Sequence, residues 1–527
     1  MQLISGRALL HMSLRPRLLF QSVAVAYVAA WVLISWLSIP ALDSYGDMVE
    51  NYAWSQTLAW GTFKHPPLVA WMVGAWFAVF PTEAWPYYLL SYLNAGAGLV
   101  GIVCLARLWL PDDMPGDRRD VFELTAWLFA ALSFPYSNLA AKFNTDTVLL
   151  SVWPWTAYAF FAALRAVETR RRWLFTVLLG VMAAAAMLGK YYSALLLASL
   201  VVVSLSHSDY RRWYRTKYPY VAVAVFLLLL LPHVLWEIRM DFPFRQYLES
   251  KIDANVDPGR MAVFLLSGIY YLPASWLAWL VLRRRFSVAG KQPVAWTFPV
   301  RGLVLLCCLP SIITASFNLF ARVHLTTHWA IPAWFALPVL LAVWLLPNVG
   351  EQFAWKRFER GLAVLGVALL AGGLLYTLAL SIIGDPKYSL ARQEMVRTID
   401  TRFAARFPGQ ELSWAGGSWP ESGALAFFSP NHPRALPGFP DERRAMVNPY
   451  QAWQARYGVI ICYASGTYAR EGSHDTECEN QTRGWLHSHQ LPLEEETLNY
   501  HAEGWRYIRA QPKNVTVFWI QPAREKL

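Results

Sequence analysis

Long apolar segments recur through the first 384 residues of this 527-residue chain. Eleven of them approach the roughly 17 to 25 residues that an α-helix needs to cross about 30 Å of hydrocarbon. They lie at 18–40, 84–108, 120–135, 146–167, 173–189, 191–207, 218–236, 262–282, 298–319, 328–347 and 361–384. With 56% hydrophobic and 15% charged residues, the chain is also more apolar than ordinary soluble domains. We therefore predict a polytopic α-helical membrane protein with about eleven spans, the first of them uncleaved.

The arrangement of basic residues predicts the orientation of these spans. The apolar stretch 66–81 lies between Pro66, Pro67 and Pro81 and is barely long enough to cross a membrane. If it does not cross, the basic loops share the side of the N-terminus; they contain Arg118/Arg119, Arg170–Arg172, Arg211/Arg212/Arg215/Lys217, Arg283–Arg285/Lys291 and Lys356/Arg357/Arg360. Because Lys and Arg in short loops stay in the cytoplasm, we expect a cytoplasmic N-terminus. The net charge of +11 then reflects topology and lipid headgroups rather than nucleic acid.

The composition changes after about residue 385, where the chain becomes polar and rich in turns. The runs "YGVIICYA" and "NVTVFWIQP" are typical of buried strands, and 389–405 and 484–500 are candidate helices. We expect residues 385–527 to form a small extracytoplasmic α/β domain. Cys462 and Cys478 would lie in an oxidising compartment there, where a disulfide is as plausible as two free thiols.

The run "GDMVENYAWSQTLAWGTFKHPPLVAW" (46–71) places ionisable groups between two apolar stretches. Asp47 and Glu50 are three residues apart and would share one face of a short helix. Tyr and Trp side chains around them are typical of the headgroup level of a membrane. A solvated loop with an incidental pair of acids explains the pattern about equally well.

Further ionisable groups are predicted on the same side of the membrane. Asp146 in "KFNTDTVLL" is explained by a helix N-terminus, and Lys190 in "LGKYYSALL" by snorkelling to the interface. Lys64 and His65 end the same outer loop as Asp47 and Glu50, and His328 comes from another outer loop. Each of them alone is more typical of a structural role. Together they would form a site with carboxylates and a ring of cations.

This combination of groups favours one type of chemistry. A carboxylate can take a proton from an acceptor hydroxyl, and cations can stabilise a phosphate leaving group. Aromatic rings would lie along a sugar and an isoprenoid chain. No CxxC, HExxH or P-loop motif points to zinc or nucleotide hydrolysis, and the GxGxxG at 96–101 lies inside the apolar run 84–108 rather than after a strand, so it does not indicate dinucleotide binding. The pattern indicates sugar transfer from a polyprenyl phosphate.

Four motifs in order, "GDMVENYAWSQTLAWGTFKHPPLVAW", "NTDTVLL", "LGKYYSALL" and "LLPHVLWEIRMDF", resemble the GT-C fold glycosyltransferases that use lipid-phosphate sugars. This superfamily includes protein O-mannosyltransferases and lipid A aminoarabinose transferases, and the resemblance covers roughly residues 20–345. It implies a GT-C-like domain over 1–384 with 11 to 13 transmembrane helices and a first outer loop at 41–83.

The resemblance also implies roles for single residues. Asp47 takes the position of the catalytic base or a group next to it, and Asp146 shapes the same catalytic site. Glu50, Lys64, His65, Lys190, Tyr191 and His328 are the implied substrate-binding residues, with His65 as a phosphate contact. Many relatives carry a second acid directly after the first, where this chain has Met48. A divalent metal ion is therefore only a possible cofactor, with Asp47 and Glu50 as its possible ligands.

The expected reaction is an inverting displacement on a polyprenyl-phosphate-linked sugar, at the outer face of the plasma (inner) membrane. The expected acceptor is a glycolipid such as lipid A or lipopolysaccharide, or a cell-envelope polysaccharide. A protein O-mannosyltransferase-like enzyme, a flippase for an anionic lipid-linked substrate and a non-catalytic scaffold are the alternatives. A flippase would need ionisable groups at mid-membrane depth, whereas these acids lie at the ends of the predicted spans.

Overall fold

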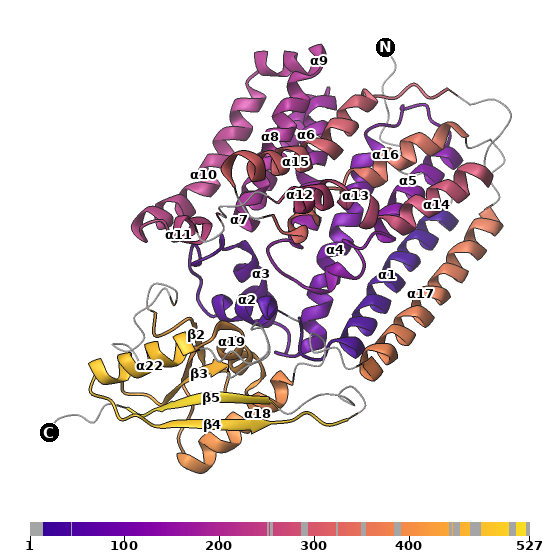
Figure 1. The fold of residues 1–527 in the computed structure, drawn as a ribbon. Coiled ribbons are helices and arrows are strands. Elements are labelled where there is room, and N and C mark those ends of the chain that lie inside the picture. The colour runs from indigo at the N-terminus through magenta and orange to yellow at the C-terminus, as the bar shows by residue number, and fades with distance from the viewer. Residues whose placement is uncertain are drawn as a thin grey trace.

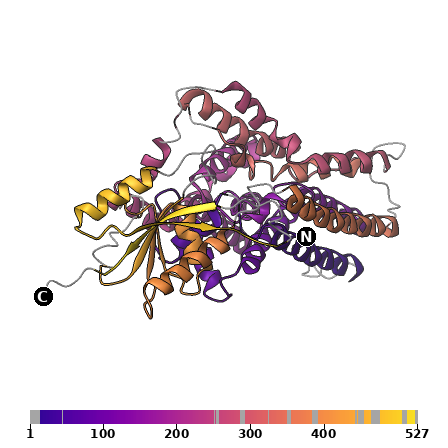
Figure 2. The ribbon, with the colours of Figure 1, turned by 60° about the horizontal axis from the view of Figure 1, so that its bottom comes forward.

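The computed structural model describes residues 14–43, 45–249, 252, 257–285, 293–322, 325–348, 355–383, 391–441, 445, 454–463, 476–504 and 513–522. Figure 1 shows a large bundle of helices and, at one end of it, a small domain built around a β-sheet. The view turned by 60° separates the same two parts (Figure 2). The predicted fold class, a polytopic helical protein with a small C-terminal α/β domain, is confirmed.

The helical part contains the longer helices α1 (Leu14–Ser38), α4 (Ala84–Arg107), α5 (Gly116–Ala131), α6 (Leu149–Arg165), α7 (Thr169–Gly189), α8 (Ala194–Leu205), α10 (Tyr218–Arg239), α15 (Val300–Ala321) and α17 (Trp355–Ile383). Shorter helices are α2 (Asp47–Ser55), α3 (Leu68–Phe77), α9 (Ser208–Arg212), α11 (Pro243–Glu249), α12 (Pro258–Leu265), α13 (Ser267–Tyr270), α14 (Pro273–Arg285) and α16 (Leu337–Leu345). Helix α17 packs along α1 at one edge of the bundle (Figure 1).

Five helices in the described part of the chain are long and apolar enough to cross a membrane, or six if the bent unit of 191–215 counts as one span. They correspond to the predicted spans at 18–40, 84–108, 173–189, 218–236 and 298–319. The predicted spans at 120–135, 146–167 and 328–347 correspond to the shorter helices α5, α6 and α16, so the number eleven stays a prediction.

The prediction of one continuous span over 262–282 is wrong. This region is divided among α12, α13 and α14, and the last of these begins at Pro273. A proline has no backbone N–H to donate and fits best at the start of a helix, so the chain breaks there.

Helix α3, with 10 residues, is about 15 Å long and too short to cross about 30 Å of hydrocarbon. Its length agrees with the prediction that 66–81 does not span.

The C-terminal domain contains one five-stranded sheet with the order β2-β1-β3-β5-β4. Its strands are β1 (Trp414–Gly417), β2 (Arg434–Pro437), β3 (Gly458–Tyr463), β4 (Glu495–Tyr500) and β5 (Lys513–Ile520). The first three strands are parallel, and β5 runs antiparallel to both β3 and β4. Helices α18 (Arg392–Arg406), α19 (Trp419–Phe428) and α22 (Thr476–Ser488) pack around the sheet.

Most of the helices and strands predicted for this domain are confirmed, and one predicted helix is wrong. The strands at "YGVIICYA" and "NVTVFWIQP" are confirmed as β3 and β5, and the helix near 389–405 is α18. The predicted helix over 484–500 is wrong after Ser488, since 495–500 form strand β4. Pro492 interrupts the helix, and β5 offers the following residues a hydrogen-bonding edge. Cys462 and Cys478 form a disulfide that joins β3 to α22.

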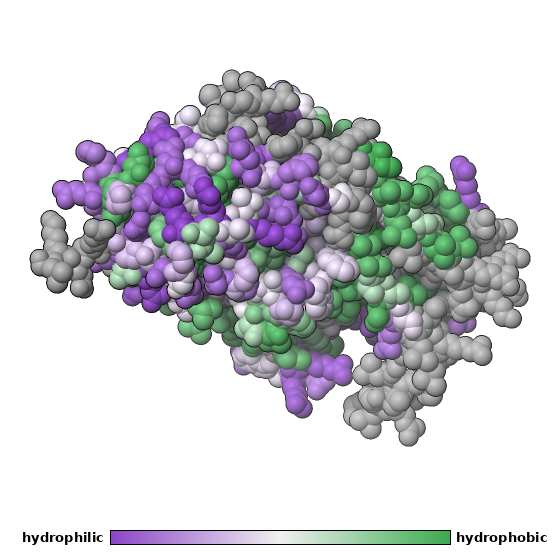
Figure 3. Space-filling view, turned by 90° about the horizontal axis from the view of Figure 1, so that it is seen from below, coloured by the Kyte–Doolittle hydropathy of each residue, from purple (hydrophilic) through white to green (hydrophobic). Residues whose placement is uncertain are grey.

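The C-terminal domain packs on the helix that carries Asp47 and Glu50. Helix α19 makes extensive contacts with α2, and Phe427 of α19 lies 5.1 Å from Tyr52 between ring centroids. Seen from below, hydrophilic side chains cover the C-terminal domain, and hydrophobic side chains gather on the side of α1 and α17 (Figure 3). The helix α2 therefore lies at the boundary between an apolar bundle and a polar domain.

Removal of the disulfide should destabilise this domain. The two cysteines are 16 residues apart, and closing a loop of that length stabilises a fold by about 3 kcal/mol. We expect the double substitution Cys462→Ser and Cys478→Ser to lower the melting temperature of the domain by roughly 6–12 °C. Pulse proteolysis of the full chain at rising temperature measures this change. The free cysteine Cys308 supplies the control, Cys308→Ala, and equal melting of both proteins would contradict the expectation.

Candidate active site

The backbone that leads into α2 is organised by a residue that the sequence analysis did not single out. Asp43 accepts hydrogen bonds from the backbone N–H groups of Tyr45, Gly46, Asp47 and Met48, at 2.7 to 3.1 Å. It therefore satisfies donors at the start of α2 that have no partner within the helix. Gly46 adopts φ 84°, and a Cβ there would lie 2.9 Å from the Cβ of Pro420. Only glycine fits this turn.

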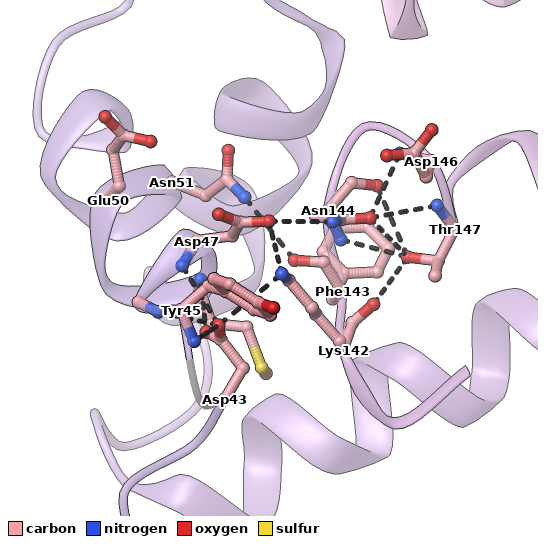
Figure 4. A network of polar contacts seen from close by, with 12 residues as sticks. Asp43, Tyr45, Asp47, Glu50, Asn51, Lys142, Phe143, Asn144, Asp146 and Thr147 are labelled. Carbon is pink, nitrogen blue, oxygen red and sulfur yellow. Dashed lines mark hydrogen bonds and ion pairs between the residues drawn. The ribbon is translucent and has the colours of Figure 1, made fainter. Parts of the chain in front are cut away.

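Asp47 lies at the N-terminus of α2, and side chains of the neighbouring loop 142–147 bind its carboxylate (Figure 4). Its Oδ2 atom lies 2.5 Å from Lys142 Nζ and accepts a hydrogen bond of 2.9 Å from Asn144 Nδ2. The same ammonium group lies 3.6 Å from Asp43 Oδ1 and 4.8 Å from the centre of the Tyr45 ring. One lysine thus pairs with two carboxylates at this point.

The electrostatics of this group keep Asp47 ionised. Burial raises the pKa of the carboxyl, but the Lys142 ammonium and its hydrogen bond outweigh burial, so the pKa of Asp47 is held well below its usual range. The same pair raises the pKa of Lys142, against the effect of burial. Both partners are therefore charged at neutral pH.

Glu50, one turn along α2, is directed away from Asp47 (Figure 4). Its Oε1 atom lies 2.6 Å from Lys64 Nζ, and the side chain of Glu50 is only 7% exposed. The Lys64 ammonium also lies 4.3 Å from the ring centre of Trp419, which belongs to the C-terminal domain. Burial raises the pKa of Glu50 to about 7, although Lys64 opposes the change.

Asp146 forms the third acid–lysine pair of this region. Its carboxylate binds the ammonium of Lys190, and both side chains are nearly buried. Its backbone N–H donates to Asn144 Oδ1 at 3.0 Å, while the amide of the same asparagine binds Asp47. Asn144 therefore bridges the surroundings of Asp47 and Asp146, which lie on the same side of the molecule.

The other predicted site residues surround these pairs. His328 faces the Tyr45 ring at 6.2 Å between ring centroids and is within electrostatic range of Asp47, Asp146, Lys142 and Lys190. The His65 ring lies 5.6 Å from that of Tyr247. The Tyr191 hydroxyl lies 2.7 Å from both His233 Nε2 and Glu237 Oε1, at the end of α10. Its predicted role in substrate binding stays a prediction.

The sequence analysis missed Asp43, Lys142, Asn144, His233, Glu237 and Tyr247. Lys142 and Asn144 belong to the run "KFNTDTVLL", which was considered only for its acid, and His233 and Glu237 belong to the fourth motif. Asp43 lies two to five residues before the N–H groups that it binds, so its place ahead of α2 was a local signal, whereas the importance of Tyr247 depends on groups distant in the sequence.

The donor set does not fit a resident metal ion. Glu50 binds Lys64 and Asp47 binds Lys142, so these two carboxylates do not converge on a common point. An ammonium already occupies the space between Asp43 and Asp47. Within the described ranges, no three His, Cys, Asp or Glu side chains are grouped so that they could hold a metal. We derive no chemical step through a metal.

Titration of Glu50 should make stability depend on pH. The folded protein binds this proton more tightly than the unfolded chain, because the pKa rises from 4.5 to about 7. Glu50 therefore stabilises the fold at low pH, and that contribution is lost as pH rises through this window. Relative to Glu50→Gln, we expect wild-type stability to fall by on the order of 3 kcal/mol between about pH 4.5 and 7.5.

Thermal unfolding of both proteins across this range measures the difference, with Glu83→Gln at an exposed position as the control. Parallel curves for the wild type and Glu50→Gln would show that Glu50 does not titrate in this window.

Comparisons with known proteins agree with this architecture. A family model described as dolichyl-phosphate-mannose-protein mannosyltransferase matches residues 64–236. The lipid A galacturonosyltransferase RgtD of Rhizobium johnstonii is 25% identical over 348 residues, which are 63% of this chain and 66% of that protein. The chain thus spans slightly less than two thirds of that relative.

Two crystal structures of ArnT from Cupriavidus metallidurans superpose over most of the molecule. The one bound to undecaprenyl phosphate has a TM-score of 0.53 at 17% identity, and the apo structure has a TM-score of 0.56 at 15% identity. Each match covers 95% of this chain and 98% of the ArnT chain. The chain therefore has the GT-C fold of these ArnT structures.

Proposed function

We propose that this protein transfers a sugar from a polyprenyl-phosphate donor to a glycolipid of the lipid A type, at the outer face of the plasma (inner) membrane. The observation that supports it most is the ionised Asp47 at the start of α2, set among three lysines that are all held by carboxylates. This is an acceptor-activating group beside cations of the kind that bind phosphate.

In the proposed reaction, Asp47 accepts a hydrogen bond from the acceptor hydroxyl and orients it. The hydroxyl oxygen forms a bond to the anomeric carbon while the bond from that carbon to the phosphate oxygen breaks. The phosphate keeps the electron pair, and the configuration at the anomeric carbon inverts. The low pKa of Asp47 favours late proton transfer, after bond formation has made the hydroxyl acidic.

The leaving phosphate would be stabilised by Lys64, His65 and Lys190. Two of these side chains are neutralised by carboxylates in the described state, Lys64 by Glu50 and Lys190 by Asp146. Each ammonium group has three N–H donors. An arriving phosphate could therefore bind the same lysines that the acids already hold. The acids would thus keep the lysines in place before the donor arrives.

Topology supports an outer-face location. Helix α9, which carries Arg211 and Arg212, lies at the end of the bundle opposite the C-terminal domain (Figure 1). Short loops rich in arginine stay in the cytoplasm, so the C-terminal domain and the acid–lysine pairs would face outward, with a cytoplasmic N-terminus.

The choice of acceptor depends on the relatives. The name of RgtD specifies lipid A as what that enzyme acts on, and this favours a glycolipid acceptor here. The matching family model is described by protein mannosylation, so a protein acceptor is the second candidate. A flippase is less favoured, since the acid–lysine pairs involve α2 and the ends of α6 and α7 rather than the middle of long helices.

The test is release of free undecaprenyl phosphate by the purified protein. The protein is incubated with undecaprenyl-phosphate-linked sugars and lipid A, and mass spectrometry follows both the donor and the acceptor. Sugar transfer predicts equal amounts of free undecaprenyl phosphate and glycosylated lipid A. Intact donor with every sugar and with either lipid A or a protein acceptor would contradict the proposal.

Asp47→Asn should separate folding from chemistry. The amide keeps the size and one hydrogen bond but cannot accept the proton, so we expect turnover to fall by about 10² to 10⁴. Asp112→Asn, at an almost fully exposed acid before α5, should turn over like the wild type. Asp47→Asn protein that melts normally and transfers sugar at the wild-type rate would exclude the assigned role.

A further inference from the structure

A large cavity lies between the helical part and the C-terminal domain. Its volume is about 720 Å³, which is enough for a disaccharide. One wall contains Glu50, Lys64 and Tyr247, and the opposite wall contains Trp419, Asp441 and Glu477 from the C-terminal domain. The predicted substrate-binding residues Glu50 and Lys64 thus face a domain that the sequence analysis left without a function.

Contacts at both ends of α2 fix these two walls relative to each other. At its start, the buried Arg392 donates hydrogen bonds of 2.9 and 2.6 Å to the carbonyl groups of Ala41 and Asp43. At its end, the side chain of Gln56 accepts from the N–H of Ala435 at 2.9 Å and donates to the carbonyl of Pro433 at 3.1 Å.

Close packing adds to this restraint in the middle of α2. A Cβ on Gly423 of α19 would lie 2.8 Å from the Val49 carbonyl oxygen, so the two helices approach as closely as their backbones permit. The disulfide holds α22, whose first turn supplies Glu477 to the cavity. The cavity is therefore preorganised rather than a gap between two loosely attached domains.

The lining combines aromatic faces with hydrogen-bonding groups. The Trp419 ring lies over the Lys64 ammonium, and Trp54, Tyr247 and Tyr463 add further aromatic surface. Carboxylates and the amides of Gln246 and Gln481 offer acceptors and donors for hydroxyl groups. Flat rings beside such groups are suited to a sugar, which has apolar C–H faces and hydroxyl edges.

The charged side chains that line the cavity limit the type of sugar that it can bind. Among the described lining residues, Glu50, Asp441 and Glu477 are acids and Lys64 is the cation that accompanies them. Lys64 is paired with Glu50, and Glu477 adds a carboxylate to the wall formed by the C-terminal domain. A uronic acid at that wall is repelled by Glu477, whereas hydroxyl-rich and amino sugars are not.

We infer that this cavity binds a neutral or amino saccharide, the sugar headgroup of the acceptor, between α2 and the C-terminal domain. This inference rests on the proposed function for the identity of the ligand as acceptor. Tyr247 connects the cavity to the chemistry, because it lines the cavity and lies within electrostatic range of Asp47, Glu50 and Asp146. A headgroup bound here would have its hydroxyl groups close to the acids.

Saturation-transfer NMR on the detergent-solubilised full chain tests the inference without any donor. Lactose, a glucosamine disaccharide and digalacturonic acid serve as the neutral, amino and anionic probes. We expect binding of the first two and none of the third. Trp419→Ala should weaken that binding by about tenfold, which corresponds to about 1.4 kcal/mol. Trp85→Ala, a matched control outside the cavity lining, should bind like the wild type.

Gln481→Ala provides a second variant at an exposed position, where folding is not at risk. It should also weaken binding, by a smaller factor. Binding of digalacturonic acid as tight as that of lactose, or unchanged binding in both Trp419→Ala and Gln481→Ala, would overturn the inference. Because no sugar transfer is needed for this readout, its failure is distinct from failure of the proposed function.

Turnover then distinguishes the acceptor from the donor. Trp419→Ala should raise the KM for lipid A and leave the KM for the undecaprenyl-phosphate sugar unchanged. A raised donor KM with an unchanged acceptor KM would overturn the assignment to the acceptor.

Discussion

The pairing of Asp47, Glu50 and Asp146 with one lysine each is the constraint on which the rest of this site depends. Removing a carboxylate from water costs several kcal/mol unless a partner compensates it. Asp47, Glu50 and Asp146 are compensated by Lys142, Lys64 and Lys190, and these six residues come from α2, the loop after it, the loop before α6 and the end of α7. The ion pairs therefore join separate parts of the chain at one place.

The C-terminal domain is part of this arrangement. It holds α2 at both ends, through Arg392 and through Gln56, and it places Trp419 over Lys64. Arg392 binds the backbone carbonyl group of Asp43. The side chain of Asp43 in turn accepts hydrogen bonds from four backbone N–H groups at the start of α2. The position of Asp47 is thus determined by residues on both sides of it in the sequence, as far apart as Asp43 and Arg392.

The features that were predictable from sequence are those governed by local patterns. Long apolar runs predicted the helical membrane architecture, and short apolar runs predicted β3 and β5. The acids of α2 stand out because charge is rare between apolar stretches. Proline-interrupted segments such as 262–282 were not predictable in this way, since Pro154, Pro232 and Pro310 lie inside helices whereas Pro273 begins one.

Side-chain pairs whose members are distant in the sequence were not predictable from sequence patterns. Spacing alone put Asp47 and Glu50 on one face of α2, but each carboxylate turns to a different lysine, Lys142 or Lys64. Lys142 is 95 residues from Asp47, and no periodicity connects them. The cavity shared with the C-terminal domain was not predictable for the same reason, because its two walls come from segments more than 150 residues apart along the chain.

The most direct measurement is a cryo-electron microscopy structure of the protein in lipid nanodiscs loaded with undecaprenyl phosphate. The account predicts phosphate density on the same side of the membrane as the C-terminal domain, in contact with at least one of Lys64, His65 and Lys190. Density for the phosphate at the opposite face, next to the arginine-rich loops, would contradict it.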